Sequence, residues 1–165
     1  MRPMRRAGLA SLVALVAVLV LAMPVLAQDP GALKFLQETY RVYKTSVKGI
    51  DLSSEAKASR YFVPALVTLF KADLEEQQKT GEVGRIDFDP FTGGQDWDLK
   101  WGRSLTIQVA PGTTAETATG TVQFMADVPV KVTLDLQKIA AGWRIADIRW
   151  SNSPGSLVEI LSAKE

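Results

Sequence analysis

The spacing of apolar side chains changes once along this chain, and that change constrains the fold more than any other feature. Up to about residue 80, apolar residues such as Leu33, Leu36 and Tyr40 recur every three or four positions, which is the spacing of one helical face. After Gly102 they alternate with polar residues, a pattern typical of strands with one buried face. The sequence therefore predicts an α+β domain, with N-terminal helices packed on one face of a curved, four-stranded antiparallel sheet.

The expected elements follow from this pattern and from the turn residues between its segments. Helices are expected over residues 31–48, 54–60 and 61–80; strands over 105–109, 117–125, 130–137 and 143–150; and a short C-terminal helix over 157–161. Short turns between the strands predict an antiparallel meander. Residues 82–102 keep no period and are rich in Asp, Gly and Trp, so we expect a long ordered loop, which is often a functional segment.

The N-terminal segment has the three parts of a secretory signal. Arg2, Arg5 and Arg6 precede a long apolar run that ends at Ala27, so we predict a signal peptide over residues 1–27 and a single domain over residues 28–165. The protein is then expected in the periplasm or outside the cell. The alternative is an uncleaved anchor, because about 20 apolar residues suffice to span a bilayer. Cleavage is favoured by Pro24, which interrupts the apolar helix just before the small-residue site.

Composition excludes several classes of function. The chain has no Cys and no His, so it has no lipid-modified cysteine, no disulfide, no imidazole base and no ordinary zinc site. Its 19 basic and 18 acidic residues are nearly balanced, which argues against a nucleic-acid partner or a polybasic membrane surface. No phosphate-cradling glycine motif occurs, and we expect no cofactor.

The loop contains the candidate site. Its carboxylates Asp87, Asp89, Asp96 and Asp98 are weak candidates for a Ca²⁺ site, but their spacing does not match an EF-hand, and aspartates also cap turns and helix starts. We therefore predict no metal. We predict instead a contact surface on the loop, formed by Asp89, Phe91, Gln95, Asp96, Trp97 and Trp101.

Two stretches resemble known families. The segment Gly142-Trp143-Arg144-Ile145-Ala146-Asp147-Ile148-Arg149-Trp150 looks like the final strand of the cone-shaped, cystatin-like fold of the nuclear transport factor two superfamily. A second stretch resembles the signature loop of the YbjP-like family of exported bacterial envelope proteins of unknown function: Asp87-Phe88-Asp89-Pro90-Phe91-Thr92-Gly93-Gly94-Gln95-Asp96-Trp97. The resemblance to this family extends over residues 32–161 of the chain. This resemblance implies a fold and a compartment but no activity, and the chain lacks the acylated Cys of the lipoprotein members.

The cone-shaped fold also implies an alternative function. Its members often enclose an apolar pocket in which a carboxylate and a tyrosine transfer protons, as in ketosteroid isomerase. Tyr40, Tyr43, Tyr61 and Asp147 are the available groups. Strict alternation on the last strand would place Asp147 on the same face as Arg149, with which it could instead form a surface ion pair.

These observations lead to one expectation and two alternatives. We expect a non-catalytic periplasmic binding or protein-interaction domain with an envelope protein as partner and no membrane span after cleavage. A small-molecule pocket protein or enzyme of the same fold is the first alternative. An immunity or inhibitor protein that acts on an envelope enzyme is the second, suggested by size and compartment.

Overall fold

The predicted order of elements is confirmed by a computed structural model, which describes residues 29–163. The predicted signal peptide and its cleavage position lie outside the described residues. The helices are α1 (Pro30–Tyr40), the 3-10 turn η1 (Val42–Lys44), α2 (Glu55–Ala58), α3 (Pro64–Thr80), α4 (Leu99–Gly102) and α5 (Leu157–Ser162). The strands are β1 (Thr106–Pro111), β2 (Thr117–Met125), β3 (Pro129–Ile139) and β4 (Gly142–Trp150).

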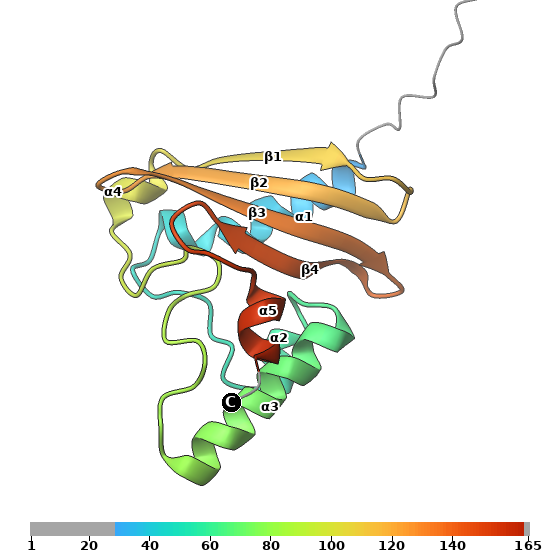
Figure 1. Cartoon of the computed structure of the whole chain (residues 1–165). Helices are drawn as coiled ribbons and strands as arrows, with labels where there is room; N and C mark the ends of the chain where they lie inside the picture. The colour runs from blue at the N-terminus through green and yellow to red at the C-terminus, as the bar shows by residue number, and fades with distance from the viewer. Residues whose placement is uncertain (1–28, 164–165) are drawn as a thin grey trace, which may run out of the picture.

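The four strands form one antiparallel sheet in the order β1-β2-β3-β4, and α1 lies across its buried face (Figure 1). Alternate residues of β2 and β3 are buried, such as Val122 opposite Val132, because one face of each strand contributes to the core. At Gly120 the helix comes close to the sheet, since a Cβ there would lie 2.4 Å from Leu36 Cδ1. The sheet and α1 therefore form the main core.

Strand β4 does not follow the strict alternation expected for it, because it contains a β-bulge. Asp135 lies opposite Asp147, but the next residue of β3 lies opposite Ile145, so Ala146 has no partner across the strands. The extra residue turns Asp147 and Arg149 to the outer face. Their side chains form an ion pair of 3.4 Å there, as the surface alternative predicted.

The first helix is shorter than its apolar spacing predicted. α1 ends at Tyr40, and the chain continues through η1 into an extended segment. Thr45 and Ser46 lie at this end, where Thr45 Oγ1 donates to Val42 O and Ser46 Oγ accepts from Lys48 N. Hydroxyl side chains that bond the backbone in this way compete with helical hydrogen bonds, which explains why no helix continues beyond η1.

The helices α2, α3 and α5 form a second group beside β4, and the far end of α3 projects away from the sheet (Figure 1). The edge of β4 is covered by a parallel bridge from Phe62 to Ile145 and an antiparallel bridge from Ser156 to Arg149. Ser156 and Glu159 form a capping box that starts α5. No helix within residues 29–163 has the length and apolarity needed to cross a membrane.

Candidate functional site

The loop between α3 and β1 is closed on itself around Asp89. The Asp89 amide donates to Gly94 O at 2.9 Å, and Asp89 O accepts from the amides of Thr92 and Gly93 at 3.1 and 2.8 Å. Its carboxylate oxygen Oδ1 accepts from the Phe91 amide at 2.8 Å. One residue thus holds both ends of a tight turn, which explains the Asp-Pro and Gly-Gly pairs in the sequence.

Four hydrogen bonds fix this turn to distant parts of the chain. Three of them use a main-chain carbonyl as the acceptor. They run from Tyr40 OH to Phe91 O at 2.8 Å, from Trp150 Nε1 to Pro90 O at 2.8 Å, from Trp97 Nε1 to Tyr43 O at 2.7 Å, and from Tyr43 OH to Asp89 Oδ2 at 2.5 Å. The loop is therefore held by α1, η1 and β4 and is ordered without forming a long element of its own.

Phe91 is the centre of the aromatic core and not part of an exposed surface. Its side chain is 0% exposed, and its ring stacks on Phe62 with a centroid distance of 5.6 Å. The rings of Tyr40, Tyr43 and Tyr61 surround it at 5.6 to 6.4 Å. Of the six predicted contact residues, Phe91 is thus the one whose side chain is fully buried and out of reach of a partner.

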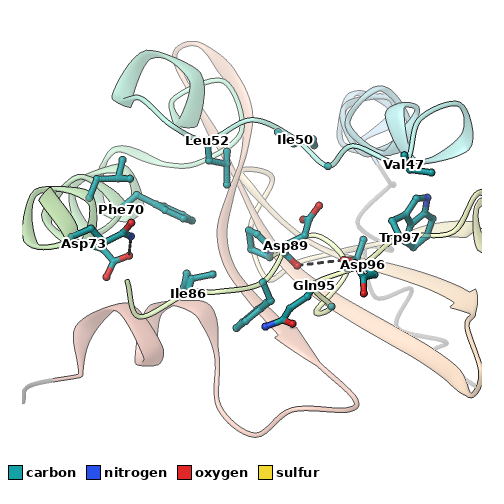
Figure 2. Close-up of a pocket in the computed structure, with 17 residues that line it drawn as sticks. Val47, Ile50, Leu52, Phe70, Asp73, Ile86, Asp89, Gln95, Asp96 and Trp97 are labelled. Atoms are coloured by element: carbon teal, nitrogen blue, oxygen red, sulfur yellow. Dashed lines mark hydrogen bonds between the residues drawn. The ribbon is translucent and has the colours of Figure 1, made fainter. Parts of the chain in front are cut away.

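A groove of about 330 Å³ lies beside the turn. Figure 2 shows its three sides: the segment with Val47, Ile50 and Leu52, the α3 side chains Phe70 and Asp73, and the loop residues from Ile86 to Trp97. Asp89 lies in the middle of the groove, while Gln95 and Asp96 are exposed at its rim. The groove brings together Asp89, Gln95, Asp96 and Trp97 of the predicted set, and leaves out Phe91 and Trp101.

The carboxylate of Asp89 is in an unusual environment for an acid. Burial raises the pKa of Asp89 above its ordinary value of 3.8, and the hydrogen bonds from Tyr43 and the Phe91 amide oppose that rise. Burial and the nearby Asp89 charge raise the pKa of Tyr43, so its hydroxyl stays protonated and donates. Asp89 has no Lys or Arg partner within the described part of the chain, whereas Asp73 is paired with Arg85 at 3.6 Å.

The four weak metal candidates point to different partners. Asp87 Oδ2 accepts from Gln95 Nε2 at 3.0 Å, and Asp98 Oδ1 accepts from the Lys100 amide at 2.8 Å, which caps α4. Asp89 is engaged by Tyr43, and Asp96 lies at the rim. Across residues 29–163 no group of three or more Asp or Glu is arranged to hold a metal ion.

The two predicted tryptophans are in contact with each other, and Trp97 also lines the groove that contains Asp89. Trp97 and Trp101 are half-buried and meet edge to face at a centroid distance of 5.6 Å, beside a smaller hollow of about 210 Å³ that Phe124 also lines. Trp97 therefore lines both the groove and this smaller hollow.

The groups named for a proton-transfer pocket do not converge. Tyr40 and Tyr43 are buried with their hydroxyls on the loop, but Asp147 Oδ1 accepts from the amides of Ile148 and Val158 beside β4. The carboxylate that does meet a tyrosine is Asp89. The sequence reasoning missed Ile50 and Asp73, which line the groove from segments far from the loop, and no local motif marked them.

Comparisons with known proteins identify a similar fold but no family. No protein-family model matches the chain, and no curated protein matches it. A chain of the native type VI effector-immunity complex Tae3-Tai3 from Ralstonia pickettii superposes with a TM-score of 0.50 at 23% identity, covering 74% of this chain and 93% of that chain. A chain of the selenomethionine form of that complex gives a TM-score of 0.49 at 20% identity, over 76% of this chain and 98% of that chain. This protein is thus similar in fold to a chain of a type VI effector-immunity complex.

Proposed function

We propose that this protein is a non-catalytic interaction domain of the immunity type, exported to the periplasm, which binds a partner protein through the rim of the groove. The observation that carries the proposal is the rigid turn around Asp89, which presents the exposed Gln95 and Asp96 beside apolar side chains. A loop ordered before binding loses little conformational entropy on association, which favours tight complexes. The fold shared with a chain of an effector-immunity complex supports the same conclusion.

Loss of the gene in the native host tests this function. We expect cells without the protein to lose viability in coculture with isogenic cells that retain it, because the toxic partner is no longer bound. Full-length wild type should restore viability, and Gln95→Ala/Asp96→Ala should not. The matched control is Gln108→Ala/Glu116→Ala. It likewise removes one exposed carboxamide and one exposed carboxylate, but from β1 and the turn that follows it.

Binding itself is measured by crosslinking the tagged full-length chain in the envelope and identifying captured proteins by mass spectrometry. The rim variant should weaken binding of the captured effector about tenfold or more in calorimetry, while the control variant should not. Normal survival of the deletion strain, together with no captured effector, would rule out the immunity function.

A small-molecule pocket is the second candidate. It is favoured by the apolar walls of the groove and by the raised pKa of Asp89 within it. Under this function, a compound from a thermal-shift screen should raise the Tm of the wild type but not of Val47→Trp, which adds bulk from an exposed position on the groove wall. Equal stabilisation of both forms would place the compound elsewhere.

A further inference from the structure

The walls of the groove fit a flexible aliphatic chain. Val47, Ile50 and Leu52 form one side and Ile86 the other, and no Lys or Arg among residues 29–163 lines the groove. Its volume of about 330 Å³ lies at the small end of the range for ligand pockets, about 300 to 1,000 Å³, so it suits one inserted side chain better than a large ligand.

The charge inside the groove has one sign. Asp73, Asp89 and Asp96 all line it, and Arg85 compensates Asp73 alone. The two hydrogen-bond donors to Asp89 are neutral groups, the Tyr43 hydroxyl and the Phe91 amide. An anion would therefore be repelled, while a cation would find an acceptor that has no counter-ion within residues 29–163.

The carboxylate of Asp89 is held in place and still has acceptor capacity. A carboxylate offers about four lone-pair sites, and the two donors from Tyr43 and Phe91 occupy one on each oxygen. The side chain is only partly buried, and it lines the groove near Ile50 (Figure 2). The carboxylate therefore retains acceptor capacity on both oxygens, with Gly49 lying against Oδ2.

We propose that the groove receives a Lys or Arg side chain of the partner protein, with Asp89 as its counter-ion. The aliphatic stem of that residue packs against Val47, Ile50 and Ile86, and its charged head reaches the carboxylate. This inference rests on the proposed interaction function and names the chemistry of the partner residue that the same site recognises.

The test uses the full-length chain and two short peptides that differ in one charge. The probes are acetyl-Gly-Arg-Gly-amide and its citrulline analogue, in which a neutral urea of the same shape replaces the guanidinium. NMR titration should show saturable shifts of the Phe91 and Gly94 amides with the arginine peptide, because both amides lie in the turn closed by Asp89. The citrulline peptide should bind at least about tenfold more weakly, the usual loss when a hydrogen bond to a charged group is removed.

Two variants test which carboxylate binds the arginine peptide. Asp89→Asn keeps the shape and removes the charge, and we expect it to bind the arginine peptide at least about tenfold more weakly. Asp96→Asn removes a rim charge and should change the affinity less. An amide spectrum of each variant that superposes on the wild type outside the loop shows that folding is intact.

The outcomes separate this inference from the immunity function. Equal binding of the arginine and citrulline peptides, or unchanged binding by Asp89→Asn, overturns the counter-ion inference even where an effector is captured. Selective arginine binding that Asp89→Asn abolishes supports the inference, even where the deletion strain survives and the immunity function fails.

Discussion

Asp89 has two sets of neighbours that act on its pKa in opposite directions. Burial in the groove favours the protonated acid, while Tyr43 and the Phe91 amide stabilise the carboxylate. Burial is the larger effect, so the folded protein holds the proton more tightly than the unfolded chain does. This sign determines how the residue contributes to stability as pH changes.

The pH dependence of Asp89→Asn follows from that sign. The contribution of Asp89 to stability is fully present below its unfolded pKa near 3.8 and is lost as pH rises through the raised folded pKa. We therefore expect the free energy of unfolding of the wild type, relative to Asp89→Asn, to decrease from acid pH towards neutrality. Urea denaturation at a series of pH values measures the difference, and Asp96→Asn controls for the loss of one exposed charge. A difference that rises with pH would contradict the assignment.

At the residue scale the sequence predicted an ordered loop but could not distinguish its aspartates. The density of Asp, Gly and Trp marked the loop correctly as an ordered segment. Four similar aspartates could not be told apart, because what distinguishes Asp89 from Asp98 is the distant hydroxyl of Tyr43. Phe91 was placed on the contact surface for the same reason, since nothing in the local sequence shows that four rings enclose it.

At the scale of elements, the turn at Gly93 depends on the strand beneath it. Gly93 has a φ of +72°, and a Cβ there would lie 2.6 Å from Trp150 Cδ1. Trp150 cannot move away easily, because its Nε1 is bonded to Pro90 O. The loop and β4 thus fix each other, which is why the turn needs no regular structure of its own.

Gly93→Ala should therefore destabilise the protein. We expect a loss of about 2 to 3 kcal/mol from the strained backbone and the clash with the indole. Gly94→Ala is the matched control, because the nearest atom to its Cβ is Asp96 O at an ordinary 3.6 Å, and we expect little change. Chemical denaturation followed by tryptophan fluorescence measures both, and similar values for the two variants would show that Gly93 is not constrained as described.

The elements themselves differ in how well the sequence predicted them. The strand over residues 117–125 was predicted with its observed ends, since its alternation reports one buried face directly. The first helix was predicted too long, because apolar spacing continues to Val47 although the helix ends at Tyr40. The bulge at Ala146 depends on pairing with β3 and leaves no mark in the composition of β4.

At the scale of the whole molecule, the inner strands of the sheet are more fully enclosed than the far end of α3. Strands β2 and β3 have a neighbour on each side, while the end of α3 projects away from the sheet (Figure 1). Residues 78–82 at that end are exposed. The segment has few packed side chains to lose when it opens.

Hydrogen exchange should show this difference. We expect the amides of β2 and β3 to exchange slowest and those of residues 77–80 to exchange faster than those in the middle of α3, because local opening there exposes little apolar surface. Exchange measured by mass spectrometry on the full-length chain tests the order. Protection of the end of α3 equal to that of β3 would mean that the helix is held by contacts other than those described.

The way the loop is fixed also bears on how such proteins can diversify. Three of its four anchors bond main-chain carbonyls, those of Phe91, Pro90 and Tyr43, which every amino acid supplies. Gln95 and Asp96 at the rim contribute to none of these anchors. Substitutions at the rim can therefore accumulate without disturbing the scaffold, so partner choice can diverge between descendants of this protein while their architecture stays the same.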